Sequence, residues 1–555
     1  MKRFQPKLFS ALKTYDGKQL ANDLVAGIIV AIIALPLSIA LAIASGVSPE
    51  QGLYTAIVAG FVIAFFGGSS VNISGPTAAF ATIVAGIVIT HGISGLIIAT
   101  VMAGILLILM GVFKFGALIK YIPMTITTGF TAGIAVTILV GQIKDFLGLT
   151  YATGTPNIET LEKVENVVEN FGTINLHALL VGGIGLAILI LWPMLGRAKL
   201  GAFSKVCAKI PPSIIAVAVG ILLVQFTPLK VNTIGSLYPN LSAKFPMPSI
   251  PSFDFATVKA VLPSAFTIAV LAAIESLLSC VVSDGMIGDR HNSNTELIAQ
   301  GMGNICSGVF GGIPATGAIA RTAANVKNGG RSPIAGIVHA VVLLLFLLVL
   351  MPFAKMIPMP IIAAILFMVA YNMSEWRHFV KICKSSPLAD ILVLVITFVL
   401  TVAFDLVVAI AVGLVLAAIL FIKTISDVTE VRTWHEAADE SERDKLIPKG
   451  VRVFEINGPL FFADSDKFQQ FEIDESVRVL IVRMRSVPSL DATAMKQFEL
   501  LQARCKANGT QLLLSHVNKQ PMSVMKRSGF LKELGEEHFA ENIDAALVKA
   551  EAFVK

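Results

Sequence analysis

The sequence predicts a polytopic α-helical membrane protein that carries a soluble α/β domain at its C-terminal end. Its 555 residues have a mean hydropathy of +0.78, and only 14% of them are charged. Apolar runs long enough to cross a bilayer recur up to residue 424, and the chain beyond that point is charged and polar. This composition excludes a soluble fold for the chain as a whole.

Fourteen apolar runs are expected to cross the membrane, seven in each half of the membrane domain. Those of the first half lie near residues 23–45, 52–66, 76–91, 93–113, 123–141, 174–195 and 211–226. Those of the second half lie near residues 264–284, 295–310, 315–327, 333–353, 358–373, 387–403 and 406–423. An odd number in each half gives the two halves opposite orientations, so we expect a seven-plus-seven inverted repeat.

Basic residues orient these spans. Lysines and an arginine crowd the first 18 residues, and the basic loops at 197–209 and 377–384 fall on the same side of the membrane as the N-terminus. The positive-inside rule therefore places both termini in the cytoplasm. The expected domains are a cytoplasmic N-terminal segment (1–22), a membrane domain (23–424), a linker (425–449) and the C-terminal domain (450–555).

Two segments, one in each half, are too apolar for loops and too rich in Gly and Pro for ordinary spans. Phe66–Val84 reads FGGSSVNISGPTAAFATIV, and Phe310–Arg331 reads FGGIPATGAIARTAANVKNGGR. Each opens with Phe-Gly-Gly and has a proline (Pro76 and Pro314) ahead of a run of small residues. Corresponding interrupted segments in two halves of a membrane chain predict a transporter site where two half-helices meet.

The second of these segments is expected to form a broken helix. Extended backbone at Gly311, Gly312 and Pro314 should be followed by a short helix over Ala315–Val326, whose first N–H groups attract an anion. Arg321 adds a positive charge, and an arginine at membrane depth is rare. A Gly-rich kink in an ordinary span is the alternative interpretation.

Glu275 lies in the apolar run FTIAVLAAIESLLSCVVS, where an ionised carboxylate is costly. It is therefore functional, paired or protonated. Ser279 follows four residues later on the same helix face, so the two side chains together could hold Na⁺, or Glu275 alone could carry a proton. An ion pair between Glu275 and Arg321 that merely locks two spans is the structural alternative.

Other polar and reactive residues have plainer interpretations. The charged loop 284–296 is expected to be a solvated turn with a helix cap at Asn294 or Thr295. His339 is expected to be packed and hydrogen-bonded. The five cysteines are scattered singly, which predicts neither disulfides nor a zinc site.

No nucleotide-binding or hydrolase motif is present, so we expect no enzymatic activity and no cofactor. The formal net charge of +6 is small for the length, and it indicates no nucleic-acid partner.

In the C-terminal region, apolar strand patterns alternate with helix patterns, as in a soluble α/β domain. Strands are expected over Val451–Ile456, Val477–Met484 and Thr510–His516. Helices are expected over Asp491–Ala507 and near 520–528 and 542–553.

The whole sequence resembles the SulP family of sulfate-permease-type anion transporters, bacterial relatives of the animal solute-carrier 26 proteins. The resemblance rests on Pro36–Tyr54 (PLSIALAIASGVSPEQGLY), Ser74–Ala81 (SGPTAAFA) and the block from Glu275 to Val326. The C-terminal domain resembles a STAS domain by its order of strands and helices and by Leu490–Ala494 (LDATA).

The resemblance implies a substrate-carrying core of spans 1–4 and 8–11 that moves like an elevator against a gate of the other spans. It places a small anion between the starts of spans 3 and 10 and against span 1. The residues implied in anion binding are Leu37, Ser38, Thr77, Ala78, Gly317, Ala318 and Arg321. Many family members carry Gln where this chain has Leu37, so a side-chain amide contact is lost.

The resemblance further implies a homodimer in the bacterial inner membrane and allows a cytoplasmic protein partner at the STAS domain. The favoured function is secondary active symport of a small anion of the sulfate, bicarbonate or C4-dicarboxylate class with a proton. Glu275 is the expected proton carrier, because Ser279 alone is a poor ligand set for Na⁺. The alternatives are a Na⁺-coupled bicarbonate symporter, a nucleobase:cation symporter of similar architecture, and an anion-responsive sensor or scaffold acting through the STAS domain.

Overall fold

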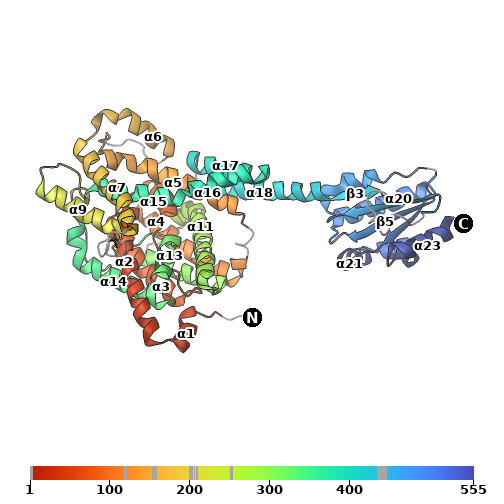
Figure 1. Ribbon diagram of the computed structural model, residues 1–555, viewed down its shortest axis with the longest axis horizontal. Coiled ribbons are helices and arrows are strands. Elements are labelled where there is room, and N and C mark those ends of the chain that lie inside the picture. The colour runs from red at the N-terminus through yellow and green to blue at the C-terminus, as the bar shows by residue number, and fades with distance from the viewer. Residues whose placement is uncertain are drawn as a thin grey trace. The chain divides into compact units, whose positions relative to one another are not determined.

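The computed structural model describes residues 4–117, 122–152, 159–198, 204, 207, 210–249, 254–404, 406–433, 447–474 and 476–554. The chain divides into two compact units, Met1–Leu414 and Val415–Lys555. The first unit is helical, and the second contains a five-stranded sheet (Figure 1).

The first half of the membrane unit is built from helices. Its helices are α1 (Lys7–Ala11), α2 (Gly17–Ala44), α3 (Pro49–Phe66), α4 (Ala81–Val112), α5 (Met124–Leu147), α6 (Thr160–Glu169), α7 (Leu176–Arg197), α9 (Pro212–Phe226) and α10 (Ile234–Leu237). Gly92 has φ 67° and ψ −174° inside α4. Only glycine adopts this backbone conformation readily, and it divides α4 into the two half-helices that the sequence predicts as spans 3 and 4.

The second half repeats the pattern. Its helices are α11 (Phe255–Ile287), α12 (Ser293–Val309), α13 (Ile319–Lys327), α14 (Ile334–Ala354), α15 (Met359–Ser374), α16 (Trp376–Ser385), α17 (Leu388–Ala403) and α18 (Leu406–Val428). Each of the fourteen predicted runs coincides with a helix or half-helix of the described chain. Within the described residues, nine helices are long and apolar enough to cross a membrane, and α9 and α17 are shorter apolar helices.

The membrane helices pack in two groups. Helices α2, α3, α4, α11, α12, α13 and α14 contact mainly one another. Helices α5, α7, α9, α15 and α17 form the second group, and fewer contacts join the two, chiefly through α2. This division agrees with the core and the gate that the family resemblance implies.

The two broken segments meet in the core. Strand β1 (Ser74–Gly75) pairs antiparallel with β2 (Thr316–Gly317), with Ser74 opposite Gly317. The predicted helix start at Ala315 is therefore wrong, because Thr316 and Gly317 are extended and α13 begins at Ile319. The extended backbone expected just before the helix runs four residues further, since it gains a partner strand from the other half.

The second unit is an α/β domain. Its sheet has the order β3 (Glu430–Thr433), β4 (Val451–Asn457), β5 (Val479–Ser486), β6 (Gln511–Ser515), β7 (Phe539–Ala540). Strands β4 to β7 are parallel, and β3 is antiparallel to β4. Helices α20 (Ala492–Ala507), α21 (Lys519–Arg527) and α22 (Phe530–Leu534) cover one face, and α23 (Ile543–Val554) covers the other. The predicted strands and helices of this domain are confirmed.

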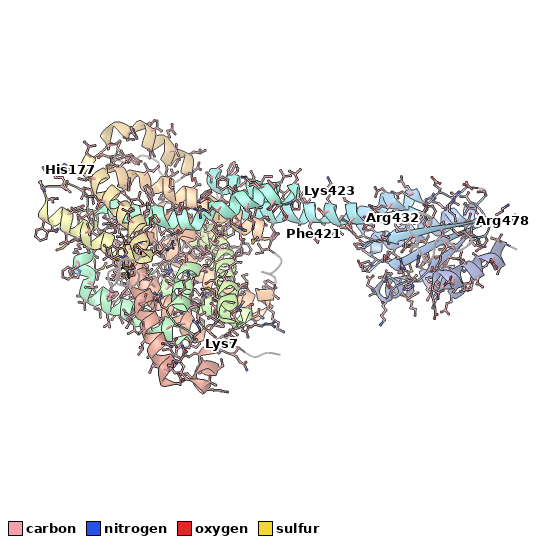
Figure 2. All side chains as sticks on the ribbon, viewed as in Figure 1. Lys7, His177, Phe421, Lys423, Arg432 and Arg478 are labelled. Atoms are coloured by element: carbon pink, nitrogen blue, oxygen red, sulfur yellow. The ribbon has the colours of Figure 1, made fainter. Side chains whose placement is uncertain are left out.

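The expected linker 425–449 has more structure than the sequence indicates. Helix α18, which carries Phe421 and Lys423, continues to Val428, and Arg432 lies on β3 at the edge of the sheet (Figure 2). Strand β3 pairs with β4 along four residues, so the sheet begins before residue 450.

Candidate functional site

The candidate site lies where β1 and β2 lead into two short helices. The Ala318 N–H donates to the Ile73 carbonyl at 2.8 Å, which extends the pairing of the two strands. A Cβ atom on Gly317 would lie 2.7 Å from Asn72 Nδ2 and 3.0 Å from Ser276 Cα. Glycine is therefore required at 317 for this close approach.

Both half-helices start with N–H groups that no earlier turn can satisfy. In α13 the first intrahelical bond runs from Thr322 N to the Ala318 carbonyl, so the N–H groups of Ile319 to Arg321 precede it. On the other side, Thr77 is the N-cap of a short 3₁₀ turn (Ala78–Phe80) that leads into α4. Two converging helix starts of this kind favour an anion.

Arg321 contributes its full charge beside these helix starts. The side chain is 2% exposed, and Nη2 donates to the Pro76 carbonyl just before the 3₁₀ turn. The expected alternative of an ion pair with Glu275 is not found among the described residues, where Arg321 has no carboxylate partner. A buried guanidinium without a counter-charge leaves a net positive charge at this point of the core.

Glu275 joins the site through a different contact. Thr77 Oγ1 donates to Glu275 Oε2 at 2.9 Å, so the carboxylate on α11 lies against the residue that caps the first half-helix. Two residues that the sequence assigned to separate roles, anion binding and coupling, are therefore in direct contact. The predicted coupling residue therefore lies beside a predicted anion-binding residue.

Ser279 lies one turn further along α11 and bonds elsewhere. Its hydroxyl donates to Asn72 Oδ1 at 2.8 Å and lies 3.1 Å from Thr322 Oγ1. Thr322 Oγ1 in turn accepts from the Ile73 N–H at 3.0 Å. These contacts tie α11 and α13 to the strand before the first half-helix, and no hydrogen bond joins Ser279 to Glu275 among the described residues.

A polar stripe on α12 supports both strands and was not predicted as part of the site. Glu296 is fully buried and accepts from Gly68 N at 2.9 Å, Asn72 Nδ2 at 2.8 Å and Gln300 Nε2 at 3.0 Å. Asn304 bonds both the N–H and the carbonyl of Ala315. The four-residue spacing of Glu296, Gln300 and Asn304 is the sequence signal that could have found this stripe.

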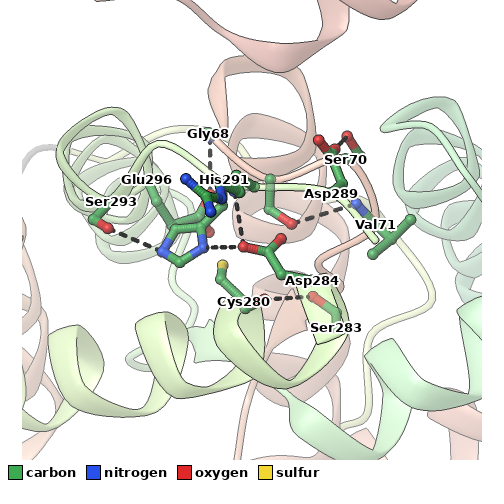
Figure 3. A network of polar contacts seen from close by, with 12 residues as sticks. Gly68, Ser70, Val71, Cys280, Ser283, Asp284, Asp289, His291, Ser293 and Glu296 are labelled. Carbon is green, nitrogen blue, oxygen red and sulfur yellow. Dashed lines mark hydrogen bonds and ion pairs between the residues drawn. The ribbon is translucent and has the colours of Figure 1, made fainter. Parts of the chain in front are cut away.

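The charged loop between α11 and α12 is partly exposed, as expected of a solvated turn, and several of its polar side chains also bond one another. Asp284 Oδ2 lies 2.7 Å from His291 Nδ1, and His291 Nε2 lies 3.0 Å from Ser293 Oγ (Figure 3). The helix cap is Asn292, which accepts from Thr295 N, and not Asn294 or Thr295. These polar groups bond one another, and the Asn292 N–H donates to the Gly68 carbonyl in the loop before β1. The contacts hold the ends of α11 and α12 against that loop.

Asp289 in the same loop attaches the N-terminal segment. Its carboxylate accepts from Ser70 Oγ at 2.6 Å and from Lys7 Nζ at 2.9 Å. Burial alone raises the pKa of Asp289, but the hydrogen bonds from Ser70 and Lys7 outweigh it and lower the pKa overall.

The span-1 residues lie on α2. Pro36 lies inside this helix and removes one backbone donor. Leu37 is half-buried, and the buried Ser38 Oγ has no hydrogen-bond partner among the described residues. No hydrogen bond joins either residue to Thr77, Ala78 or Gly317 within that part of the chain. Their assignment to the anion site stays a prediction.

His339 on α14 differs from its expected state. The ring is fully buried, as predicted, but neither nitrogen has a hydrogen-bond partner among the described residues.

An apolar hollow of about 210 Å³ lies between α2, α3, α9 and α14. Its lining, which includes Ile39, Val217 and Phe346, fits hydrocarbon and offers an anion no donor.

A membrane protein in which each half contributes a broken helix to one buried polar site belongs to the class of inverted-repeat transporters. The chain is a member of the sulfate permease family, whose model matches residues 20–397, and a STAS domain model matches residues 442–546. Members of this family are transporters and not enzymes.

Similar proteins cover nearly the whole chain. A putative sulfate transporter of Bacillus subtilis, YvdB, is 38% identical over 540 residues, which are 96% of this chain and 98% of that protein. The bicarbonate transporter BicA of a Picosynechococcus species is 31% identical over 503 residues, which are 87% of this chain and 86% of that protein.

Solved structures show the same fold. The murine solute carrier 26 family member A9, an anion transporter, superposes with a TM-score of 0.87 at 19% identity, covering 99% of this chain and 94% of that one. The transmembrane domain of a cyanobacterial bicarbonate transporter, BicA, superposes with a TM-score of 0.61 at 28% identity, covering 73% of this chain and 98% of that one.

Proposed function

We propose that the protein is a secondary active transporter that carries a small inorganic anion together with a proton. The observation that carries the proposal is the contact between Thr77 and Glu275 beside Arg321. It brings an anion-attracting helix start, a permanent positive charge and a titratable carboxylate into one site.

The charges of the site give the coupling. An anion on the two helix starts balances the charge of Arg321, and ionised Glu275 is then left as an uncompensated negative charge. Bringing a second negative charge next to a carboxylate is unfavourable, because the two repel strongly where water is excluded. A proton on Glu275 removes this repulsion, so anion and proton bind together.

A proton fits this site better than Na⁺. Sodium requires several oxygen ligands, and the expected second ligand, Ser279, is already engaged by Asn72 and Thr322. Thr77 Oγ1 is the side-chain oxygen bonded to Glu275 among the described residues. Sodium-coupled bicarbonate symport remains the alternative that the transport assay distinguishes.

The packing supports an elevator-like movement of the core. The candidate anion-site residues lie on core helices and on the strand and turns that lead into them, and the core contacts the gate less than it contacts itself. The core can therefore move as one body and carry the site across the membrane.

The substrate class is sulfate, bicarbonate or a C4-dicarboxylate. Backbone N–H groups and one guanidinium recognise negative charge before shape, and the relatives carry the names sulfate and bicarbonate transporter. Nucleobase symport gains no support, because a neutral base does not balance Arg321. We further propose a homodimer in a bacterial inner membrane with both termini in the cytoplasm and with the STAS domain open to a protein partner.

Substitution of Arg321 tests the anion site. Arg321→Ala should lower the affinity for sulfate, bicarbonate or succinate by about 10- to 100-fold, because one charge-assisted contact is worth about 1.5–3 kcal/mol. Binding is measured by isothermal titration in detergent, and flux by uptake into proteoliposomes. Flux also separates a transporter from a sensor that only binds the anion.

Arg331→Ala is the matched control. Arg331 bonds the carbonyls of Val326 and Gly330 outside the two helix starts. Its removal should leave anion affinity unchanged. Equal affinity of the Arg321→Ala variant and the wild type would overturn the assignment.

A further inference from the structure

Arg321 and His339 are among the buried side chains of the core that keep polar atoms without a partner among the described residues. Arg321 Nε and Nη1 and both ring nitrogens of His339 lack a hydrogen bond, while the two residues are 2% and 0% exposed. A buried polar group without a partner is costly, and structures retain such groups where a water or a function compensates.

The two groups lie along the same face of α3. A Cβ atom on Gly75 would lie 2.7 Å from Arg321 Nη1 and 3.4 Å from Ala56 Cα. A Cβ atom on Gly60 would lie 3.9 Å from His339 Nδ1 and 3.2 Å from the Ser74 carbonyl oxygen. Ala56 and Gly60 are one helical turn apart, so the guanidinium and the imidazole occupy neighbouring levels behind β1.

The residues around His339 are small or apolar. Gly60 and Ala64 on α3 face α14 at His339 and Gly336, and among the described residues Arg321 is the charged group whose field reaches the ring. A neutral imidazole offers one donor and one acceptor, whereas a protonated ring offers two donors and would repel the guanidinium. The neutral ring therefore has one nitrogen that can accept a hydrogen bond from a group located between His339 and Arg321.

We propose that His339 is a positioning residue for Arg321, acting through a buried water held between the imidazole and the free guanidinium edge. The water accepts from Arg321 Nε or Nη1 and donates to the acceptor nitrogen of the ring. This link holds the guanidinium against the Pro76 carbonyl, at the start of the first half-helix. The inference rests on the proposed role of Arg321 in anion binding.

Two variants of His339 test the link. His339→Phe keeps a planar ring and removes both nitrogens, and it should weaken sulfate, bicarbonate or succinate binding by about tenfold without lowering the Tm. His339→Gln keeps one donor and one acceptor and should bind within about threefold of the wild type. Affinity is measured by isothermal titration and the Tm by thermal unfolding, both on the full-length protein in detergent.

Thr397→Val is the matched control. Thr397 Oγ1 on the gate helix α17 is also buried without a partner among the described residues. Its removal should leave anion affinity unchanged. A loss of affinity in His339→Phe that Thr397→Val does not share is then due to the position of His339 beside Arg321.

The Arg321→Lys background tests whether His339 acts through the guanidinium. Lysine lacks Nε–H and the planar fork, so adding His339→Phe should cause no further loss of affinity. Additive losses would overturn the inference, as would a loss in His339→Phe that His339→Gln shares or that accompanies a lower Tm.

Failure of this inference is distinguishable from failure of the proposed function. If Arg321→Ala leaves affinity unchanged, the anion site itself is wrong. If Arg321→Ala loses binding and His339→Phe does not, only the role of His339 is overturned.

Discussion

The hydrogen bond from Thr77 to Glu275 determines how readily the carboxylate accepts a proton in the proposed mechanism. Thr77 Oγ1 donates to Oε2 at 2.9 Å, and a donor of this kind stabilises the ionised form of the acid. Thr77→Val removes the donor and keeps the shape of the side chain. The protonated form then becomes easier to reach, so the pH at half-maximal transport should rise.

The size of this rise follows from the energy of the contact. A hydrogen bond to a charged group contributes about 1.5–3 kcal/mol. One pH unit corresponds to about 1.36 kcal/mol of difference between two protonation states, so the midpoint should move up by about one to two units. Thr77 is only half-buried, which favours the lower end of this range.

The assay is uptake of labelled anion into proteoliposomes without Na⁺, measured as initial rate across a series of pH values. Thr77→Ser is the control, because it keeps the hydroxyl and should keep the wild-type midpoint. A midpoint that Thr77→Val leaves in place would refute the link between this contact and proton binding.

Three further predictions concern stability and reactivity. In Glu296→Gln the new amide group faces the donors of Gly68, Asn72 and Gln300, so the unfolding free energy should fall by about 1–3 kcal/mol. A Tm equal to that of the wild type in detergent would contradict this. Asp491→Ala removes the cap that accepts from Ala494 N at 2.8 Å, and it should cost about 1 kcal/mol and speed hydrogen exchange in the first turn of α20. Unchanged exchange in the full-length protein would count against the cap. Burial raises the pKa of Cys505 to about 11, so maleimide should not label this thiol at pH 8 until the domain unfolds. Rapid labelling of the native protein would show that the thiol is accessible.

Local sequence rules predict most of the fold because the features concerned are local. Gly92 divides two spans, and the repeated Phe-Gly-Gly segments mark the two broken helices. The alternating strands of the C-terminal domain are equally visible. Each of these features depends on residues a few positions apart, which a linear sequence displays directly.

Features that depend on pairing between the two halves were not predictable in this way. The start of α13 moves to Ile319 because Thr316 and Gly317 pair with a strand 242 residues earlier in the chain. Glu296 is charged and follows a polar loop in the sequence, which indicates a solvated position. Its partner Asn72 is 224 residues away, and their contact is buried.

The candidate site shows the same limit. The family resemblance placed Thr77 and Arg321 near one anion, and spacing along one helix paired Glu275 with Ser279. The structure instead brings Glu275 to Thr77 and Ser279 to Asn72. Helix spacing shows which residues share a face of one helix. It does not show which residues of other helices that face contacts in the folded protein.

The most direct test of the proposed coupling is uptake of labelled sulfate, bicarbonate and succinate into proteoliposomes under an inward proton gradient without Na⁺. The gradient should accelerate uptake of at least one of these anions by the wild-type protein. Glu275→Gln should keep anion binding and exchange but lose the response to the gradient. Uptake that requires Na⁺ and ignores the proton gradient would contradict proton coupling through Glu275.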